Sequence, residues 1–255
     1  MARETRKMSG RGRWRFWLGA LAVAAVCGST AVAAFKVRDY AVTSGSFTLS
    51  RERSDALTVE GLHYAVRSKV MRVFDGDFGH SIFSAPLDER RRRLLAIDWV
   101  EDASVSRVWP DRLIVRIRER RPVAFVSFRS GVLLIDAHGV LLDPPAQSHF
   151  SFPVLSGIRE DQDEAQRAEC VQTLLRLQKE LGGHSGDISE VNAADPDDVR
   201  VVVRVDNQTV ELLMGDSNFD ARYRTFLGHF AEIRGKSPEG KTFDLRLDDR
   251  ITVKE

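Results

Sequence analysis

The chain has 255 residues, of which 43% are hydrophobic and 29% charged, and this composition excludes a disordered chain. A net charge of only +1 does not suggest a nucleic-acid-binding surface. Two cysteines, Cys27 and Cys170, exclude a disulfide-rich scaffold and a zinc site held by cysteines. The length leaves room for one large or two small domains.

A basic head and an uncharged stretch begin the chain. Residues 1–15 hold six basic side chains and one acidic, and residues 16–35 hold no charge. A helix of this length spans about 30 Å, one bilayer core. Two interpretations remain open, an uncleaved membrane anchor or a secretory signal cleaved near Ala31-Val32-Ala33. The anchor is favoured because the apolar core of a signal peptide is usually about 7–15 residues long. In both cases the head stays in the cytoplasm and the rest crosses the membrane.

Residues 36–54 lack periodicity and are expected to form a linker, and residues 55–121 predict a small domain. Its expected strands are 56–61, 100–108 and 113–118, and its expected helices lie near 66–74 and 87–95. The alternation along 113–118 places Val115 and Ile117 on an apolar face and Arg116 and Arg118 on the other. Two helices on a three-stranded sheet form an α+β unit.

Four consecutive arginines, Arg90 to Arg93, lie in the second of these helices. One interpretation is a patch that binds anions or lipid headgroups. The other, which we favour, is a solvated outer face partly paired with Asp88 and Glu89.

Residues 122–255 predict a second, mostly antiparallel β domain with two helices. Strands are expected at 123–128, 131–142 as a hairpin, 188–192, 199–205, 209–214, 242–247 and 250–254, and helices near 161–181 and 219–234. Asp248-Asp249 is expected to form the turn between the last two strands, and the final strand is a candidate open edge. Trp99 and Trp109 are expected to pack in the core or at a domain edge.

No pattern in the chain indicates catalysis. The six histidines are not paired at a spacing typical of metal ligands, and neither a nucleophile elbow nor a phosphate-binding loop is present. We therefore predict no catalytic residue, no metal site, no cofactor and no enzymatic activity.

Several segments, taken together and in order, resemble the FtsQ/DivIB cell-division proteins. These are Ile97-Asp98-Trp99-Val100, then Trp109-Pro110-Asp111-Arg112-Leu113, then Glu119-Arg120-Arg121-Pro122-Val123-Ala124, with Gly61, Gly79–Phe83 and Phe152–Gly157. Ser81 stands where the family has asparagine. The resemblance implies a POTRA domain at 55–121 and a C-terminal β domain at 122–255, after a cytoplasmic head at 1–15, a transmembrane helix at 16–35 and a linker at 36–54.

The resemblance also implies a function. A protein of this family is a non-enzymatic divisome scaffold of the inner membrane, with its N-terminus in the cytoplasm and its bulk in the periplasm, enriched at the division septum. It binds FtsB and FtsL, and other division proteins through the POTRA domain, and links early division proteins to septal peptidoglycan synthesis. It binds membrane and no nucleic acid.

The implied partner site lies at the C-terminal edge, where the family takes up FtsB by extending the sheet. Phe243-Asp244-Leu245-Arg246-Leu247 resembles the family's Val-Asp-Leu-Arg-Tyr, so Arg246 matches its contact arginine, while Leu247 replaces its tyrosine. The residues expected to form the site are Phe243, Arg246, Leu247, Ile251, Thr252, Val253 and Lys254. Two alternatives stay open: an ordinary edge blunted by Arg250 and Lys254, and, for the whole chain, a POTRA-containing module of polypeptide transport or outer-membrane assembly.

Overall fold

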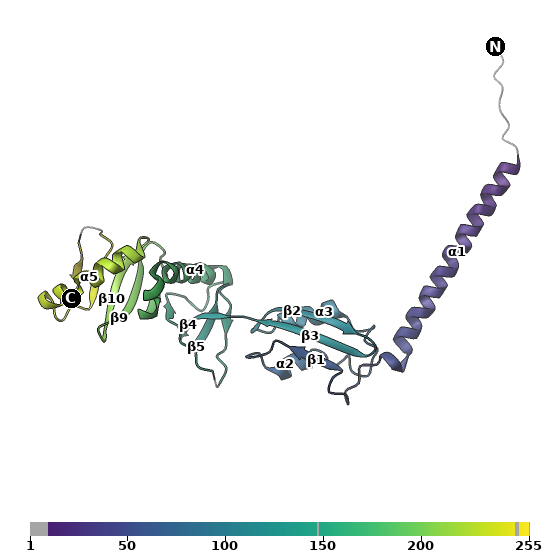
Figure 1. The fold of residues 1–255 in the computed structure, drawn as a ribbon, viewed down its shortest axis with the longest axis horizontal. Helices are drawn as coiled ribbons and strands as arrows, with labels where there is room; N and C mark the ends of the chain where they lie inside the picture. Colours follow the sequence, from purple (N-terminus) through teal and green to yellow (C-terminus); the bar gives the residue numbers. More distant parts are fainter. Residues whose placement is uncertain (1–9, 147, 248–249, 255) are drawn as a thin grey trace, which may run out of the picture. The chain divides into compact units, whose positions relative to one another are not determined.

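The structure is a computed structural model that describes residues 10–146, 148–247 and 250–254 (Figure 1). Contacts divide the chain into two compact units. The first unit comprises Met1–Leu62, Val66–Leu95 and Asp102–Ile117, and the second comprises His63–Ala65, Ala96–Glu101 and Arg118–Glu255.

The first helix, α1, spans Gly10–Thr43 and is longer than the uncharged stretch in the sequence. Its Gly19–Thr43 part is long and apolar enough to cross a membrane, and no other helix of the described residues meets that test. The expected linker therefore begins as helix. The helix ends at Thr43, and Ser44 caps the short 3-10 helix η1 at Gly45–Phe47, its side chain accepting a hydrogen bond from the Ser46 N–H.

The first unit contains a three-stranded sheet in the order β1-β3-β2, with helices α2 and α3. The strands are β1 Leu57–Glu60, β2 Val100–Val108 and β3 Arg112–Glu119, and the helices are α2 Arg67–Arg72 and α3 Leu87–Leu95. The expected α+β arrangement is confirmed. Val115 is fully buried and Ile117 nearly so, whereas the side chain of Arg116 is 63% exposed, so the expected register of β3 is also confirmed.

The arginine row of α3 is not one solvated face. The buried guanidinium of Arg90 makes two hydrogen bonds to buried Asp77, from Nε at 2.7 Å and from Nη2 at 2.9 Å. These hydrogen bonds raise the pKa of Arg90 above its usual value. Arg91 donates to the Ala103 carbonyl at 2.8 Å, and Arg93 pairs with Glu89 as the favoured interpretation expected. A helix of nine residues turns its side chains all round its axis, so one of four consecutive arginines faces inward.

The second unit is built on a nine-stranded sheet in the order β12-β11-β10-β9-β8-β7-β4-β5-β6. Its strands are β4 Pro122–Phe128, β5 Gly131–Asp136, β6 Leu141–Leu142, β7 Val154–Ser156, β8 Ile188–Asn192, β9 Val199–Val205, β10 Gln208–Gly215, β11 Thr242–Asp244 and β12 Thr252–Lys254. Three neighbouring pairs are parallel, β4 with β7, β7 with β8 and β10 with β11, and the other five are antiparallel. The expected, mostly antiparallel sheet is confirmed.

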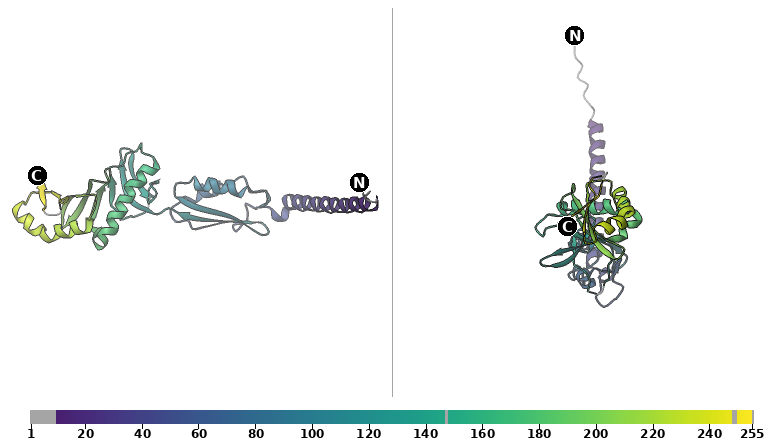
Figure 2. Two further views of the ribbon diagram at one scale, coloured as in Figure 1. Left: turned by 90° about the horizontal axis from the view of Figure 1, so that it is seen from above. Right: turned by 90° about the vertical axis from the view of Figure 1, so that its left-hand side faces the viewer.

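Two long helices, α4 at Glu164–Leu181 and α5 at Phe219–Lys236, cover one face of this sheet (Figure 2). Along β9, Val199, Val201 and Val203 are buried, while Arg200 and Arg204 between and after them are exposed. The alternation shows that one face of the sheet carries the core and the other faces solvent. A short 3-10 helix, η2, follows α4 at Gly182–Asp187.

Several observed elements differ from the expected ones. A capping box between Asp163 and Gln166 starts α4 three residues later than expected. The strand β7 was not anticipated. Trp99 packs as expected, 7% exposed with its Nε1 donating to the Asp143 carbonyl at 3.0 Å. Of the two expected placements, in the core or at a domain edge, Trp109 takes the edge: it is 71% exposed, with its ring centroid 6.0 Å from that of Phe47. Trp109 lies in the turn between β2 and β3, outside either strand.

The buried Arg90–Asp77 pair predicts that Arg90 and Arg92 of α3 contribute very differently to the stability of the fold. Arg90→Ala leaves the Asp77 carboxylate buried without its partner, and we expect it to lower the free energy of unfolding by about 3–5 kcal/mol. Arg92→Ala, on the exposed side of the same helix, should change it by less than about 0.5 kcal/mol. Denaturant unfolding of the full chain in detergent measures both. Equal effects of the two substitutions would contradict the structural role given to Arg90.

Candidate partner-binding edge

The strand β12 is the last strand at one end of the nine-stranded sheet. It pairs antiparallel with β11, with Thr242 opposite Lys254, Phe243 opposite Val253 and Asp244 opposite Thr252. Among the residues that the structure describes, no strand lies on its other side. An edge strand presents unpaired N–H and C=O groups there, and these can pair with a strand of another chain.

The edge is shorter than the sequence indicates. The expected strands were 242–247 and 250–254, and each has only three residues in the structure. The reason is local: the Asp244 carboxylate accepts the N–H of Arg246 at 3.2 Å, and the Arg250 N–H meets the Leu247 carbonyl at 3.5 Å, so the chain turns early. The expected turn residues Asp248-Asp249 lie outside the described residues. Because alternate residues of an edge strand point their backbone groups outward, three residues offer few backbone bonds to a partner.

Phe243 lies in the core and not on the contact surface. Its side chain is fully buried, with its ring centroid 5.2 Å from that of Phe226 and 6.2 Å from that of Phe230, both on α5. A partner cannot touch a side chain in this position, so its place among the contact residues is corrected: it supports β11 from beneath. The sequence pattern of β11 gave no indication of which face α5 would cover.

The other expected contact residues divide by exposure. Leu247 is 52% exposed, and Thr252 and Lys254 are exposed as well. Ile251 and Val253 are half-buried and pack on the edge of the core. The Val253 side chain lies so close to Gly240 that a Cβ at that glycine would come within 2.4 Å of it. Val253 therefore packs β12 against the second unit, and the residues on either side of Val253 face solvent.

Arg246 is held by two carboxylates. Its Nε and Nη2 donate to Asp244 at 2.8 and 2.5 Å, and its Nη1 donates to Asp198 of the loop before β9 at 3.2 Å. The hydrogen bonds from Arg246, the largest cause, lower the pKa of Asp244 from 3.8 to about 2. Lys254 adds a second cation 3.5 Å from the same carboxylate. The expected contact arginine thus already has internal partners, and an acidic group of another chain would have to share it.

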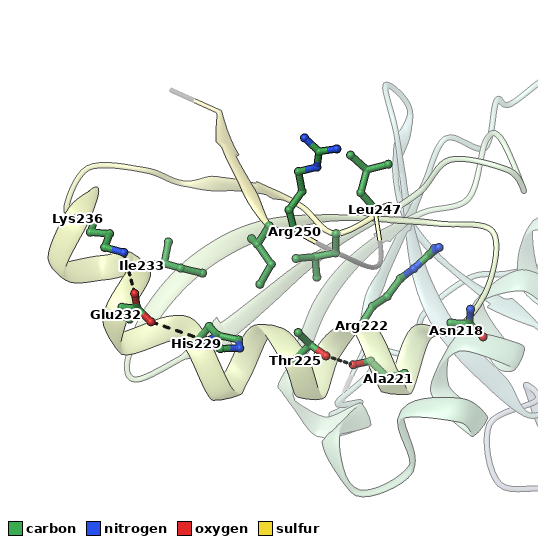
Figure 3. Close-up of a pocket in the computed structure, with 12 residues that line it drawn as sticks. Asn218, Ala221, Arg222, Thr225, His229, Glu232, Ile233, Lys236, Leu247 and Arg250 are labelled. Atoms are coloured by element: carbon green, nitrogen blue, oxygen red, sulfur yellow. Dashed lines mark hydrogen bonds and ion pairs between the residues drawn. The ribbon is translucent and has the colours of Figure 1, made fainter.

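Beside the edge lies a groove of about 630 Å³ between α5 and residues 245–247 and 250–251 (Figure 3). The lining residues on α5 recur every three or four positions, which places them on one face of the helix. They are Ala221, Arg222, Thr225, His229, Glu232, Ile233 and Lys236, together with Asn218 directly before the helix. Leu245, Leu247, Arg250 and Ile251 form the opposite wall, and Figure 3 shows Leu247 and Arg250 standing across from α5.

The groove combines apolar walls with charged ends. Ile233, Leu247 and Ile251 supply accessible hydrocarbon, and Lys236 is paired with Glu232 at 2.7 Å. Arg222 joins α5 to the opposite wall, because it donates to the Arg246 carbonyl at 3.2 Å. It also donates to the Met214 carbonyl of β10 at 2.6 Å. Such a surface suits a short amphipathic segment of a protein partner. Sequence reasoning missed the groove: the helical spacing on α5 was visible, but nothing indicated that Leu245, Leu247, Arg250 and Ile251 would lie opposite.

Within the described part of the chain, no group of three or more histidine, cysteine, aspartate or glutamate side chains is placed to hold a metal ion. Burial raises the pKa of the Cys170 thiol above its usual value, which disfavours the reactive thiolate. The absence of enzymatic activity stays a prediction.

The depressed pKa of Asp244 predicts a pH dependence. Its carboxylate is more acidic in the folded chain than the usual 3.8, so the stabilisation it gives is present above about pH 4 and is lost as the pH falls towards 2. We expect Asp244→Asn to cost about 1 kcal/mol at pH 6, less than the shift alone implies, because water screens the 41% exposed Arg246. Thermal unfolding of both proteins between pH 6 and 2 should show the difference shrinking; a constant difference would contradict the ion pair.

Comparison with known proteins assigns both units. Residues 53–120 match the family model described as POTRA domain, FtsQ-type, and residues 124–246 match Cell division protein FtsQ/DivIB, C-terminal. A Cell division protein FtsQ of Koribacter versatilis is 39% identical over 82% of this chain and 62% of its own length. Another, of Syntrophotalea carbinolica, is 26% identical over 78% of this chain and 73% of its own. The chain therefore spans less than two thirds of the length of the first of these relatives.

A solved structure, the major extracytoplasmic domain of the trans isomer of the cell division protein DivIB from Geobacillus stearothermophilus, also matches. It is 23% identical, covers 47% of this chain and 95% of its own, and has a TM-score of 0.26. The two family models follow one another along the chain in the order of its two sheets. The chain belongs to the FtsQ/DivIB family of bacterial cell-division proteins.

Proposed function

We propose that this protein is a non-enzymatic scaffold of the bacterial divisome, anchored in the inner membrane by α1. Its POTRA domain, residues 55–121, and its C-terminal domain, residues 122–255, stand in the periplasm, and the protein gathers at the division septum. It binds partners of the FtsB and FtsL type at the C-terminal edge and other division proteins through the POTRA domain. By these contacts it links early division proteins to septal peptidoglycan synthesis.

One observation carries the partner site: β12 is a terminal strand with a groove of mixed character beside it. The three-residue strand alone offers few backbone bonds, so the groove supplies the remaining contact area. A partner segment that adds a strand to β12 and then continues over Leu247 into the groove would use both. The match of residues 124–246 to the division family favours this role over the alternative of a polypeptide-transport module.

The position of Arg246 indicates which charge the proposed partner carries next to its pairing strand. Its guanidinium lies between Asp244 and Asp198 and is 41% exposed, so a carboxylate of the partner can reach it while these internal bonds hold its geometry. Charge-assisted bonds to a preoriented guanidinium are stronger than neutral ones and specify position. The partner is therefore expected to present an acidic side chain next to its pairing strand.

The edge is tested by Val253→Pro combined with Arg246→Glu. Proline removes one backbone donor and deforms the strand, and glutamate repels an acidic partner. We expect FtsB recovered with the protein from crosslinked membranes to fall by about tenfold or more, the effect of roughly 1.4 kcal/mol. Protein level and membrane association should not change.

Two matched substitutions control this experiment. Leu141→Pro places proline at a half-buried residue of β6, the terminal strand at the other end of the same sheet. Arg204→Glu reverses an exposed charge on β9. Both should leave FtsB recovery unchanged. Undiminished recovery with the double variant at the edge, or an equal loss with the controls, would refute edge pairing.

Membrane topology gives a separate test. The six basic residues before the uncharged stretch should keep the N-terminus in the cytoplasm. Alkaline phosphatase fused to the C-terminus should therefore be active, and N-terminal sequencing of the membrane protein should find the head still attached. A mature chain beginning near Ala34 would show that the segment is a cleaved signal instead.

A further inference from the structure

Three exposed aromatic side chains meet in the first unit around one buried ring. Tyr40, Phe83 and Trp109 are 64%, 42% and 71% exposed, whereas Phe47 is 9% exposed. The Phe47 ring centroid lies 6.2 Å from that of Tyr40, 5.3 Å from that of Phe83 and 6.0 Å from that of Trp109. We call these four residues the aromatic tip. They come from the end of α1, the following 3-10 helix, the loop before α3 and the β2–β3 turn, so the fold gathers them.

The aromatic tip is bound directly to the last turn of α1. The Ser81 hydroxyl donates to the Ala41 carbonyl at 2.7 Å, and the Ile82 N–H donates to the Phe47 carbonyl at 2.9 Å. Thr48 and Ser81 form an isolated antiparallel bridge. These bonds join the loop that carries Phe83 to the segment that leaves the helix. The tip therefore lies at the C-terminal end of α1.

Arg107 holds the β2–β3 turn, which carries Trp109, in its position in the tip. From β2 its Nε donates to the Ile82 carbonyl at 2.6 Å and its Nη2 to the Ala85 carbonyl at 2.7 Å. This fork holds the end of the β2–β3 hairpin, and with it Trp109, against the loop of Phe83. Asp111 in the same turn is paired with Arg53, so its charge is compensated. The exposed rings are thus preorganised and need no rearrangement to meet a partner.

The depth of the tip follows from the sequence of α1. The uncharged stretch ends at Phe35, and Lys36 and Arg38 follow, which places the boundary of the hydrocarbon there. Tyr40 comes five residues later, about 7.5 Å further along a helix that rises 1.5 Å per residue. Half the difference between the total thickness of a bilayer, about 40–45 Å, and its hydrocarbon core, about 30 Å, gives a headgroup layer of roughly 5–7.5 Å on each side. Tyr40, and with it the aromatic tip, therefore lies in the outer part of the headgroup layer.

We propose that the aromatic tip is seated in the lipid headgroup layer of the membrane from which α1 emerges, and that it holds the POTRA unit to the bilayer surface. Indole and phenol rings favour this layer because they combine an apolar body with a polar N–H or O–H. The occupant is lipid because the hydrogen bonds of the tip tie it to the end of the span itself. The proposal requires α1 to span the membrane, and it goes beyond the partner site proposed above.

Tryptophan fluorescence tests the seating in the full chain, since the four tryptophans are Trp14, Trp17, Trp99 and Trp109. Variants that retain one tryptophan, with phenylalanine at the other three positions, are reconstituted in phosphatidylethanolamine–phosphatidylglycerol vesicles. The vesicles contain either ordinary or bromine-labelled phosphatidylcholine with bromine at a shallow acyl position. Aqueous iodide is the opposing quencher.

We expect the protein that retains Trp109 to lose most of its emission to the brominated lipid and little to iodide. The protein that retains Trp17, in α1, reports insertion of the span, and the one that retains buried Trp99 should resist both quenchers. Quenching of Trp17 by lipid with Trp109 open to iodide would overturn the seating and leave the span intact. Lack of lipid quenching at both would overturn the span and the seating together.

Replacing Trp99 by phenylalanine removes its hydrogen bond to the Asp143 carbonyl, so a second measurement keeps Trp99 in place. Trp109→Phe in the otherwise unchanged chain gives the Trp109 signal by difference from the unaltered protein, and this difference should be quenched by the brominated lipid. In the variant that retains only Trp109, Tyr40→Asp with Phe83→Asp should shift the Trp109 emission to the red and restore iodide quenching, because carboxylates draw the tip into water. An unchanged spectrum would contradict the proposal.

Discussion

The C-terminal edge depends on the contact of Phe243 with α5. Phe226 and Phe230 of that helix hold the ring, and Phe243 is the middle residue of β11. The strands β10 and β11 run parallel, and α5 supplies the crossover connection that neighbouring parallel strands require. Because β12 pairs only with β11 among the described strands, its position follows from this aromatic contact. The same helix turns its polar face towards the groove, so one element fixes the edge and builds the surface beside it.

Electrostatics then limit the length of that edge. A longer strand would need Arg246 to continue the ladder, but its guanidinium and N–H are both engaged by Asp244. The carboxylate therefore ends β11 and orients the arginine at once. With so short a strand and a compensated charge, a partner of the proposed kind would need side-chain contacts in the groove for its affinity. They also blunt it against nonspecific pairing, which is the usual hazard of an open strand.

The order and type of the elements could be read from the sequence, because they follow from local periodicity. Strands β8 and β9 begin and end where the alternation predicts, and the two long helices of the second unit follow their apolar stripes. Long-range contacts decided the exceptions. Arg90 is buried since Asp77 meets it inside the unit, and Trp109 is largely exposed since it occupies a turn where its ring meets only the edge of the unit, at Phe47.

The candidate site shows the same division. The sequence by itself determined the family, the terminal position of the last strand and the acidic and basic residues around it, because these depend on residue order and local pattern. Only the tertiary structure decided which of them a partner can reach. Phe243 and Leu247 are four residues apart in similar surroundings, yet one is buried by α5 and the other forms the groove wall. The helix that packs on the strand decides which side chains are buried, and this cannot be read from the order of residues along the strand.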